Sequence, residues 1–539
     1  MKKALLILAA VVFIAPVSIL AFMPLEDEEL ETVRGQDSLD YAFGGVGFGT
    51  VDMRWTDADG SSYTAFGASG TGYLQASGVS LTQSGNDFTC FTTSAPLTLE
   101  AGGDGGSNTY VILEYPQITD WQMSFPSLIL GGSSITTTRD MGAIYLDNIS
   151  TGSSNTMQVR LDANASGYGV GAGMRISLAT TSGTFAIGDP DGFDATYLNA
   201  AYLNIDGMQI SNNAGGRASY EVDIDAGSDG TYSKIKFTGG PLNDFSVRNA
   251  RVALGSTVGA AGGTLFTFDL GNMDQGAPWT TVMEGHHDGT TGMQLTGGFN
   301  ISDGYLAVGD TDGFTETFTG TYTTAGYITW SGGIVANSID PVAYSGSGMF
   351  NFLSTDVDVG LKSGVVYWTF NDDDVKWGEL MFKYIKMGAG VDSGPSIYEW
   401  YVRHLSGSLF LAFTGIANAP TTYYKGLSMY LSTQVTDQEL VMGDNDGFGT
   451  TYTTMGYLGL IQWKISNTAN TGPLTDTFTL DGGTSATGQS CMRLTMSTVT
   501  GRVAFTPSVD KTPGGTSDGT MCQVAITGSM GGTMKIYSH

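Results

Sequence analysis

The chain has 539 residues, 78 of them Gly, and a hydrophobic fraction of 41% against a charged fraction of 14% excludes ordinary disorder. The glycines show no period of three, so a collagen helix is excluded as well. The formal net charge of −29 would repel a phosphate backbone. This excludes nucleic acid as a partner and suits either cation binding or solubility outside the cell.

The N-terminus has the pattern of an export signal. Lys2 and Lys3 precede the apolar run 4–20, and Ala21 supplies a small residue for cleavage. We expect a signal peptide over 1–21, with an uncleaved anchor as the alternative because the run is nearly long enough to span a bilayer. No later stretch approaches that length, so no transmembrane helix is expected after the signal. A short helix is predicted over Leu25–Val33, within an N-terminal segment 22–40, and Gly35 would end it.

The residues that follow the signal carry a resemblance to a known family. Met23-Pro24-Leu25, Asp27, Leu30, Val33 and Gly35-Gln36 resemble the equivalent segment of FilA-like pilus-associated proteins, which are exported, Gly-rich β proteins of Gram-negative bacteria. The resemblance covers Met23–Gln36 only. It implies a location at the cell surface or outer membrane and a structural role, with other surface or pilus components, or copies of the chain itself, as partners.

Beyond Gln36 the sequence predicts strand after strand. Apolar and polar residues alternate over runs of five to seven residues, which is typical of a strand with one buried face. Gly, Asn, Asp and Ser separate the runs, as turns require. These observations predict an all-β fold. The runs centre on Met157/Val159/Leu161, Met174/Ile176/Leu178, Tyr220/Val222/Ile224, Phe266/Phe268/Leu270, Leu427/Met429/Leu431 and Met492/Leu494/Met496.

A long internal repeat divides the chain. The pattern Gly-Asp-x-Asp-Gly-Phe occurs at 188–193, 309–314 and 443–448, each time followed by a Thr-Tyr segment, and a degenerate copy lies at 57–60 with Gly72-Tyr73-Leu74 behind it. We expect four β repeats at 41–172, 173–291, 292–425 and 426–539, with atypical ends. Units of this length fit tandem β-sandwiches or several turns of a β-solenoid, and the many short strands bounded by Gly favour the elongated β-solenoid-like body.

The recurring turn is the first candidate for a functional site. Two carboxylates two residues apart can face one hard cation, and the Gly permits the backbone to bend around it. A calcium site would use Asp189, Asp191 and Asp194 in the first copy, Asp310, Asp312 and Glu316 in the second, and Asp444 and Asp446 in the third. The other interpretation, which the incomplete ligand pattern favours, is a tight turn whose carboxylates accept hydrogen bonds from local amides.

Residues suited to catalysis are sparse. The adjacent His286 and His287 lie outside any metalloprotease motif, and Gly515–Gly519 lacks the strand-to-helix context of a hydrolase nucleophile. Cys491 and Cys522 lie on neighbouring strand-like segments and could pair in an oxidising compartment, leaving Cys90 over. We therefore expect no enzyme and no disulfide framework.

The leading hypothesis is a non-enzymatic exported surface protein with a structural, adhesive or pilus-associated role. One alternative is an outer-membrane β-barrel, which the apparent shortness of the strands disfavours because a barrel strand needs about ten residues of alternation. The other is a secreted polysaccharide-active enzyme on a β-helix, which the scarcity of basic residues disfavours.

Overall fold

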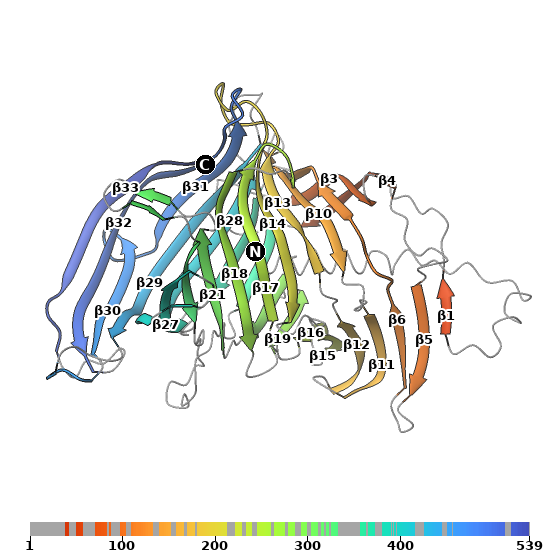
Figure 1. Cartoon of the computed structure of the whole chain (residues 1–539), viewed down its shortest axis with the longest axis horizontal. Coiled ribbons are helices and arrows are strands. Elements are labelled where there is room, and N and C mark those ends of the chain that lie inside the picture. The colour runs from red at the N-terminus through yellow and green to blue at the C-terminus, as the bar shows by residue number, and fades with distance from the viewer. Residues whose placement is uncertain are drawn as a thin grey trace, which may run out of the picture.

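The protein is a large antiparallel β structure, seen here in a computed structural model (Figure 1). The structure describes residues 38–41, 50–57, 71–83 and the strands and many of the turns between 86 and 537. The longest gaps after residue 86 are 88–96, 213–220, 332–355, 372–379 and 416–424. The signal peptide, the helix predicted over Leu25–Val33 and the resemblance at Met23–Gln36 lie outside the described residues. In the part of the chain that is described, no helix is long and apolar enough to cross a membrane.

The all-β prediction is confirmed, and the described strands form one sheet of 31 strands plus a separate small pair, β22 (Phe314–Glu316) and β23 (Gly320–Tyr322). The N-terminal strands are β1 (Ser38–Tyr41), β2 (Val51–Asp57), β3 (Gly72–Gln83), β4 (Asn86–Asp87), β5 (Leu97–Gly103), β6 (Thr109–Glu114), β7 (Trp121–Phe125), β8 (Ser127–Gly132) and β9 (Arg139–Asp140).

The middle of the chain forms two rows of strands. One row holds β10 (Ala143–Thr151), β13 (Thr181–Asp189), β14 (Ala201–Asn212), β17 (Phe245–Gly255), β18 (Gly263–Asp274), β21 (Asp303–Asp310), β24 (Gly326–Ser331) and β27 (Leu380–Gly388). The other, drawn below it in Figure 1 where its strands are labelled, holds β11 (Gln158–Ser166), β12 (Val170–Ser177), β15 (Glu221–Ser228), β16 (Ser233–Gly239), β19 (Trp279–Gly285), β20 (Met293–Gly298), β25 (Asp356–Lys362) and β26 (Val365–Asn371).

The chain passes between the rows in a regular way. Each hairpin of the second row is inserted between two strands that pair in the first, as β11 and β12 are between β10 and β13. The chain therefore runs through β10 and then β11, turns, and returns through β12 and then β13. The rows merge at β28 (Ser396–Gly415), whose first half pairs with β27 and whose second half pairs with β26. The sheet continues through β29 (Leu427–Asp444), β30 (Gly456–Asn467), β31 (Leu474–Thr484), β32 (Ser490–Asp510) and β33 (Val524–Tyr537).

The strands are longer than the alternating runs predicted. β28, β29 and β32 have 20, 18 and 21 residues, against the five to seven expected. The expectation was wrong because glycines read as turns lie inside strands, such as Gly501 in β32 and Gly528 in β33. The sheet confirms neither the solenoid nor the sandwich arrangement of the repeats. The expected repeat boundaries stay a prediction, and the one at residue 173 falls inside β12.

The alternation is confirmed, but its apolar face is not the buried one in several strands. Phe266 is 39% exposed, whereas Thr267, next to it on the opposite face of β18, is buried. Thr184 and Ala186 are likewise buried on β13, whereas the alternate residues Phe185 and Ile187 are less buried. In these strands the enclosed face carries small and polar residues and the larger apolar residues point outward. Elsewhere the enclosed face also holds large apolar side chains such as Leu254, Met273 and Val441.

The N-terminal strands branch away from the main sheet at a kink in β3. Residues 80–83 of β3 pair with β7, whereas residues 72–77 pair with β8. Gly78 lies between the two halves with a φ of 68°, and its N–H donates to Asp52 Oδ1 over 2.9 Å. Pro126 interrupts the partner strand at the same level, between β7 and β8. The branch formed by β2, β8, β9 and this half of β3 packs against β25, β26 and β28.

The sequence repeat corresponds to one hairpin register. The Asp that ends the first strand pairs with a small residue that begins the next in every copy, as Asp189–Ala201, Asp310–Gly326, Asp444–Gly456 and, in the degenerate copy, Asp57–Gly72. The preceding Gly lies under the ring of the cross-strand Tyr, in the pairs Gly188–Tyr202, Gly309–Tyr327 and Gly443–Tyr457. A Tyr ring over a Gly covers backbone that a side chain would otherwise protect. The repeated motif thus encodes a corner of the sheet.

The Gly–Tyr contact predicts the effect of a single methyl group. A Cβ at Gly309 would lie 2.2 Å from the Tyr327 ring, whereas one at Gly326, in the same hairpin, would meet nothing within 4 Å. We expect Gly309→Ala to lower the free energy of unfolding by about 1–3 kcal/mol through overpacking. The matched Gly326→Ala should be neutral or slightly stabilising. Chemical denaturation of both variants checks this, and equal effects would contradict the packing role.

Candidate functional site

The first repeat turn, residues 190–200 between β13 and β14, is the copy that the structure describes in full. Asp194 Oδ1 accepts hydrogen bonds from the amides of Thr196 and Tyr197 over 2.8 and 2.9 Å. Gly192 has a φ of 78°, and a Cβ there would lie 2.2 Å from the carbonyl oxygen of Tyr197. Phe193 N–H donates to that same oxygen, and the two rings stack with centroids 5.0 Å apart. Asp194 therefore acts as the turn interpretation predicts.

This turn docks on the C-terminal strands. Asn199 and Thr484, at the end of β31, exchange backbone hydrogen bonds of 3.2 and 2.8 Å. Thr484 Oγ1 also donates to the carbonyl of Ala200 over 2.7 Å. The ladder between β29 and β31 ends at Leu427–Leu480, so the turn continues the pairing of β31 where β29 stops. Segments nearly 300 residues apart in the chain are joined here.

Two cationic side chains cover the aromatic rings of the turn. The Arg493 guanidinium lies 4.1 Å from the centroid of the Phe193 ring, and Lys535 Nζ lies 5.1 Å from that of Tyr197. Asp481 on β31 holds Arg493 in a two-pronged ion pair, in which Arg493 Nε donates to Oδ1 over 2.9 Å and Nη2 donates to Oδ2. Cation–π contacts of this kind stabilise most when they are shielded from water. They connect the turn to β32 and β33 as well as to β31.

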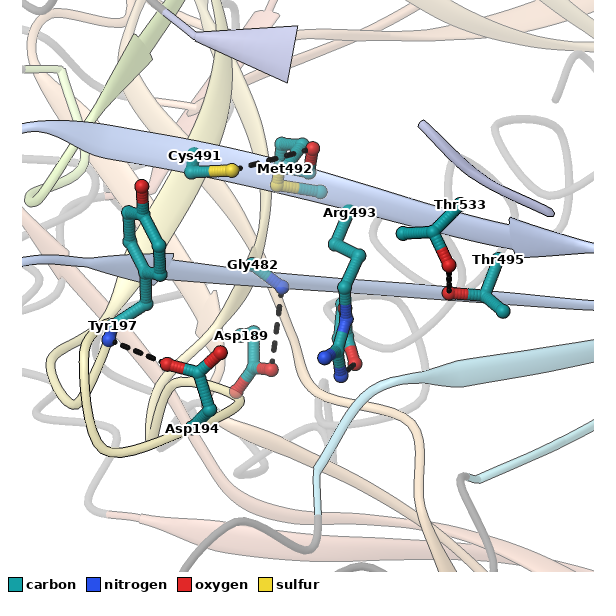
Figure 2. Close-up of polar contacts among 10 residues, drawn as sticks. Asp189, Asp194, Tyr197, Gly482, Cys491, Met492, Arg493, Thr495 and Thr533 are labelled. Atoms are coloured by element: carbon teal, nitrogen blue, oxygen red, sulfur yellow. Dashed lines mark hydrogen bonds and ion pairs between the residues drawn. The ribbon is translucent and has the colours of Figure 1, made fainter. Parts of the chain in front are cut away.

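A buried carboxyl pair lies at the base of the turn. Asp189 is almost fully buried; its Oδ1 accepts from the amide of Asp191 over 3.0 Å, and its Oδ2 accepts from the amide of Gly482 over 3.4 Å (Figure 2). Burial, followed by the hydrogen bond with the Asp191 carboxyl, raises the pKa of Asp189 to about 9. At neutral pH the Asp189 carboxyl is therefore protonated.

A second long-range link lies next to the pair. Asp140, in β9, accepts from Ser127 Oγ over 2.6 Å and from the amide of Gly142 over 2.9 Å, and it lies 3.9 Å from Lys425 Nζ. Burial raises the pKa of Asp140 in spite of these partners. Arg139 Nη1 reaches Thr414 Oγ1 on β28 over 3.4 Å. The enclosed face thus holds polar contacts between the N-terminal branch and β28.

The other predicted ligands are described only in part. Asp310 ends β21, Asp444 ends β29 half-buried, and Glu316 lies in β22; Asp312 and Asp446 fall outside the described residues. Within the described ranges, no group of three or more His, Cys, Asp or Glu is placed to hold a metal ion. In the first copy, Asp189 and Asp191 meet while Asp194 serves the turn. Calcium binding stays a prediction.

The cysteines do not form the suggested pair. Cys491 is buried and Cys522 exposed, and both thiols are free; Cys90 lies outside the described residues. Cys491 instead belongs to the small buried cluster with Phe193 and Tyr197 (Figure 2 shows Cys491 and Tyr197). Sequence reasoning missed Arg493, Asp481 and Lys535. The signal available for Arg493 was a base in a strand of alternating apolar residues, in a chain where bases are few.

The turn and calcium interpretations predict different outcomes at Asp194. Asp194→Asn keeps an oxygen that can accept from Thr196 and Tyr197, whereas Asp194→Ala removes it. We expect the Ala variant to lose about 1 kcal/mol of stability, as a lost helix cap would, and the Asn variant to stay near the parent. Thermal unfolding with and without a chelator measures both. A chelator-sensitive midpoint that the Asn variant loses would instead establish a cation site.

The buried pair predicts a pH dependence. The unfolded chain releases the Asp189 proton near pH 4, whereas the folded state retains it up to about pH 9. Between these values the folded state binds more protons, so this group's contribution to stability falls as pH rises. Asp189→Asn should flatten that fall, which denaturation at pH 5, 7 and 9 would measure. An unchanged slope would contradict the raised pKa of Asp189.

In comparisons with known proteins, no protein-family model, no curated protein and no solved structure matches the chain. The resemblance at Met23–Gln36 therefore stays a prediction. Among the described residues, the enclosed face carries polar side chains joined by hydrogen bonds and ion pairs, and the outer face carries exposed apolar side chains.

Proposed function

We propose that this chain is a non-enzymatic outer-membrane protein whose long strands cross the bilayer with their apolar side chains toward lipid. The observation that carries the proposal is the inverted distribution of side chains over the two faces of the sheet. In a protein surrounded by water, a buried polar residue and an exposed apolar patch are the features that call for an explanation. A strand in a bilayer alternates apolar outward and polar inward.

The outward face is apolar across neighbouring strands. Leu458 on β30 is 46% exposed and lies between Met442 on β29 and Val509 on β32, which are 47% and 49% exposed. The row is hydrogen-bonded side by side, so these side chains form one continuous surface rather than isolated residues. Such a surface is unfavourable in water and favourable against hydrocarbon.

The inward face at the same level is covered and carries polar side chains beside the buried Val441. Tyr457, Ser508 and Asp510 are buried beside the outward residues Leu458 and Val509. The Tyr457 hydroxyl donates to Glu399 Oε2 over 3.1 Å. Buried polar groups persist when they are hydrogen-bonded, and an enclosed polar face of this kind is typical of proteins that cross a membrane with strands.

Strand length supports the same proposal. A strand that crosses a bilayer needs about 9–11 residues, and β28, β29 and β32 each exceed that. These strands are therefore long enough for the outer-membrane alternative, which short strands would have disfavoured. Export by the N-terminal signal would bring the chain to the compartment where such proteins assemble, and calcium at the repeat turns would screen their acidic groups there.

An extracellular structural, adhesive or pilus-associated role is the second candidate. It is favoured by the exposed edge of β33, since an open strand edge is a template for pairing with another chain. The two candidates separate on extraction. The membrane protein is released only by detergent, whereas an extracellular component is released by salt, urea or shear.

The sharpest test is a charge on the outward face. In water, Leu458→Lys at a half-exposed position should change stability by less than about 0.5 kcal/mol. In lipid it should cost about 2–4 kcal/mol near the bilayer midplane and reduce the amount of detergent-extractable protein. Met521→Lys is the control, because Met521 is 60% exposed but lies outside the strands. Equal recovery of the two variants would contradict the membrane proposal.

A further inference from the structure

The last strand, β33, has an open edge. It pairs along its length with β32, which is its one hydrogen-bonded neighbour among the strands described here. Almost all of its residues are exposed on both faces. Met530, at its centre, is 64% exposed. A bulge opposite Gly531 and the single charged residue Lys535 are its protections, and it contains no Pro. The remaining length of the edge is open to pairing.

The N-terminal strands are engaged elsewhere. β1 pairs with β5, and β2 pairs with β3 and packs against β25. Figure 1 places β33 and β1 at opposite ends of the molecule. Among the described residues, the first strands of the chain therefore do not cover the edge of β33, which leaves this edge available to a second chain.

We infer that β33 pairs antiparallel with β33 of a second copy, about a two-fold axis through Met530. In this register Ile526 lies opposite Met534, Val524 lies opposite Ile536, and Gly528 lies opposite Gly532. Apolar residues meet apolar residues on one face. On the other face Thr527 meets Thr533, and the single charged residue, Lys535, meets Ala525 of the second copy.

The pattern is self-complementary, as a two-fold interface requires. If one strand slipped by one residue relative to the other, apolar residues would lie opposite Thr, Ser and Lys. The outward face of one copy would then continue the inward face of the other. If one strand slipped by ten residues, the Lys535 side chains of the two copies would lie directly opposite each other, and their like charges would destabilise the pairing. The inference rests on the β33 edge and holds whether or not the strands lie in a membrane.

Cysteine cross-linking of the full chain tests the register. In a background with Cys90, Cys491 and Cys522 replaced by Ala, Met530→Cys puts two thiols on the axis, within reach of a disulfide across the strands. We expect a reducible dimer. Met534→Cys alone should give none, because its partner position is Ile526, but a mixture of Met534→Cys and Ile526→Cys chains should form a mixed dimer.

Each other outcome overturns the inference. Equal cross-linking of Met530→Cys and Met534→Cys alone would indicate random collision. A parent chain that is monomeric by light scattering, with no dimer from Met530→Cys, would show that the edge stays free or is closed within the chain. Ile526, Met530 and Met534 are all exposed, so we expect each Cys variant to fold. Circular dichroism of each variant checks that it does, so that a negative result is not caused by unfolding. Detergent extraction of the same variants reports on the membrane proposal separately.

Discussion

The backbone ladder between adjacent strands is the interaction on which this structure depends. The enclosed face holds many Ser, Thr, Asn, Asp and Ala residues beside a few large apolar ones such as Leu254 and Val441, so apolar packing beneath the sheet supplies less than it does in a common β-sandwich. Buried polar groups there persist only with partners. The hydroxyls of Thr484 and Ser490 bond to each other over 2.9 Å, and Asp206 holds Arg251 over 2.6 Å. Side-chain bonds of this kind supplement the continuous antiparallel pairing.

The fold class could be predicted from the sequence, but the environment of each face could not. Alternation at Phe266/Phe268/Leu270 places a strand correctly, because the period of two is a property of the backbone. The same period does not say which face meets solvent. It was read as apolar-inward, the rule for proteins in water, and buried Thr267 beside exposed Phe266 reverses that rule. Strand lengths failed for a related reason, since a Gly inside a long strand looks like a turn.

In the candidate site, only the interactions between residues close together in the sequence could be predicted. The hydrogen bonds of Asp194 to Thr196 and Tyr197 depend on residues two and three positions away, which the motif contains. The partners of Asp189 and Phe193 on β31 and β32 lie almost 300 positions further along, and no spacing rule connects them. The Gly–Tyr pairs lie between these cases. Their residues stand in the repeat, but the register that places ring over glycine becomes visible only when the strands pair.

The docking of the first repeat turn also bears on how the chain folds. Asn199 and Thr484 are 285 positions apart, so the turn cannot find its partner until most of the chain has been made. Loop-closure entropy grows slowly with length, so the consequence is one of timing more than of stability. In the unfolded chain Asp189 is open to water and ionised at neutral pH. In the folded chain it is buried and accepts a hydrogen bond from Gly482 of β31, and the carboxyl holds a proton. Folding at neutral pH is therefore coupled to proton uptake from the surrounding solution.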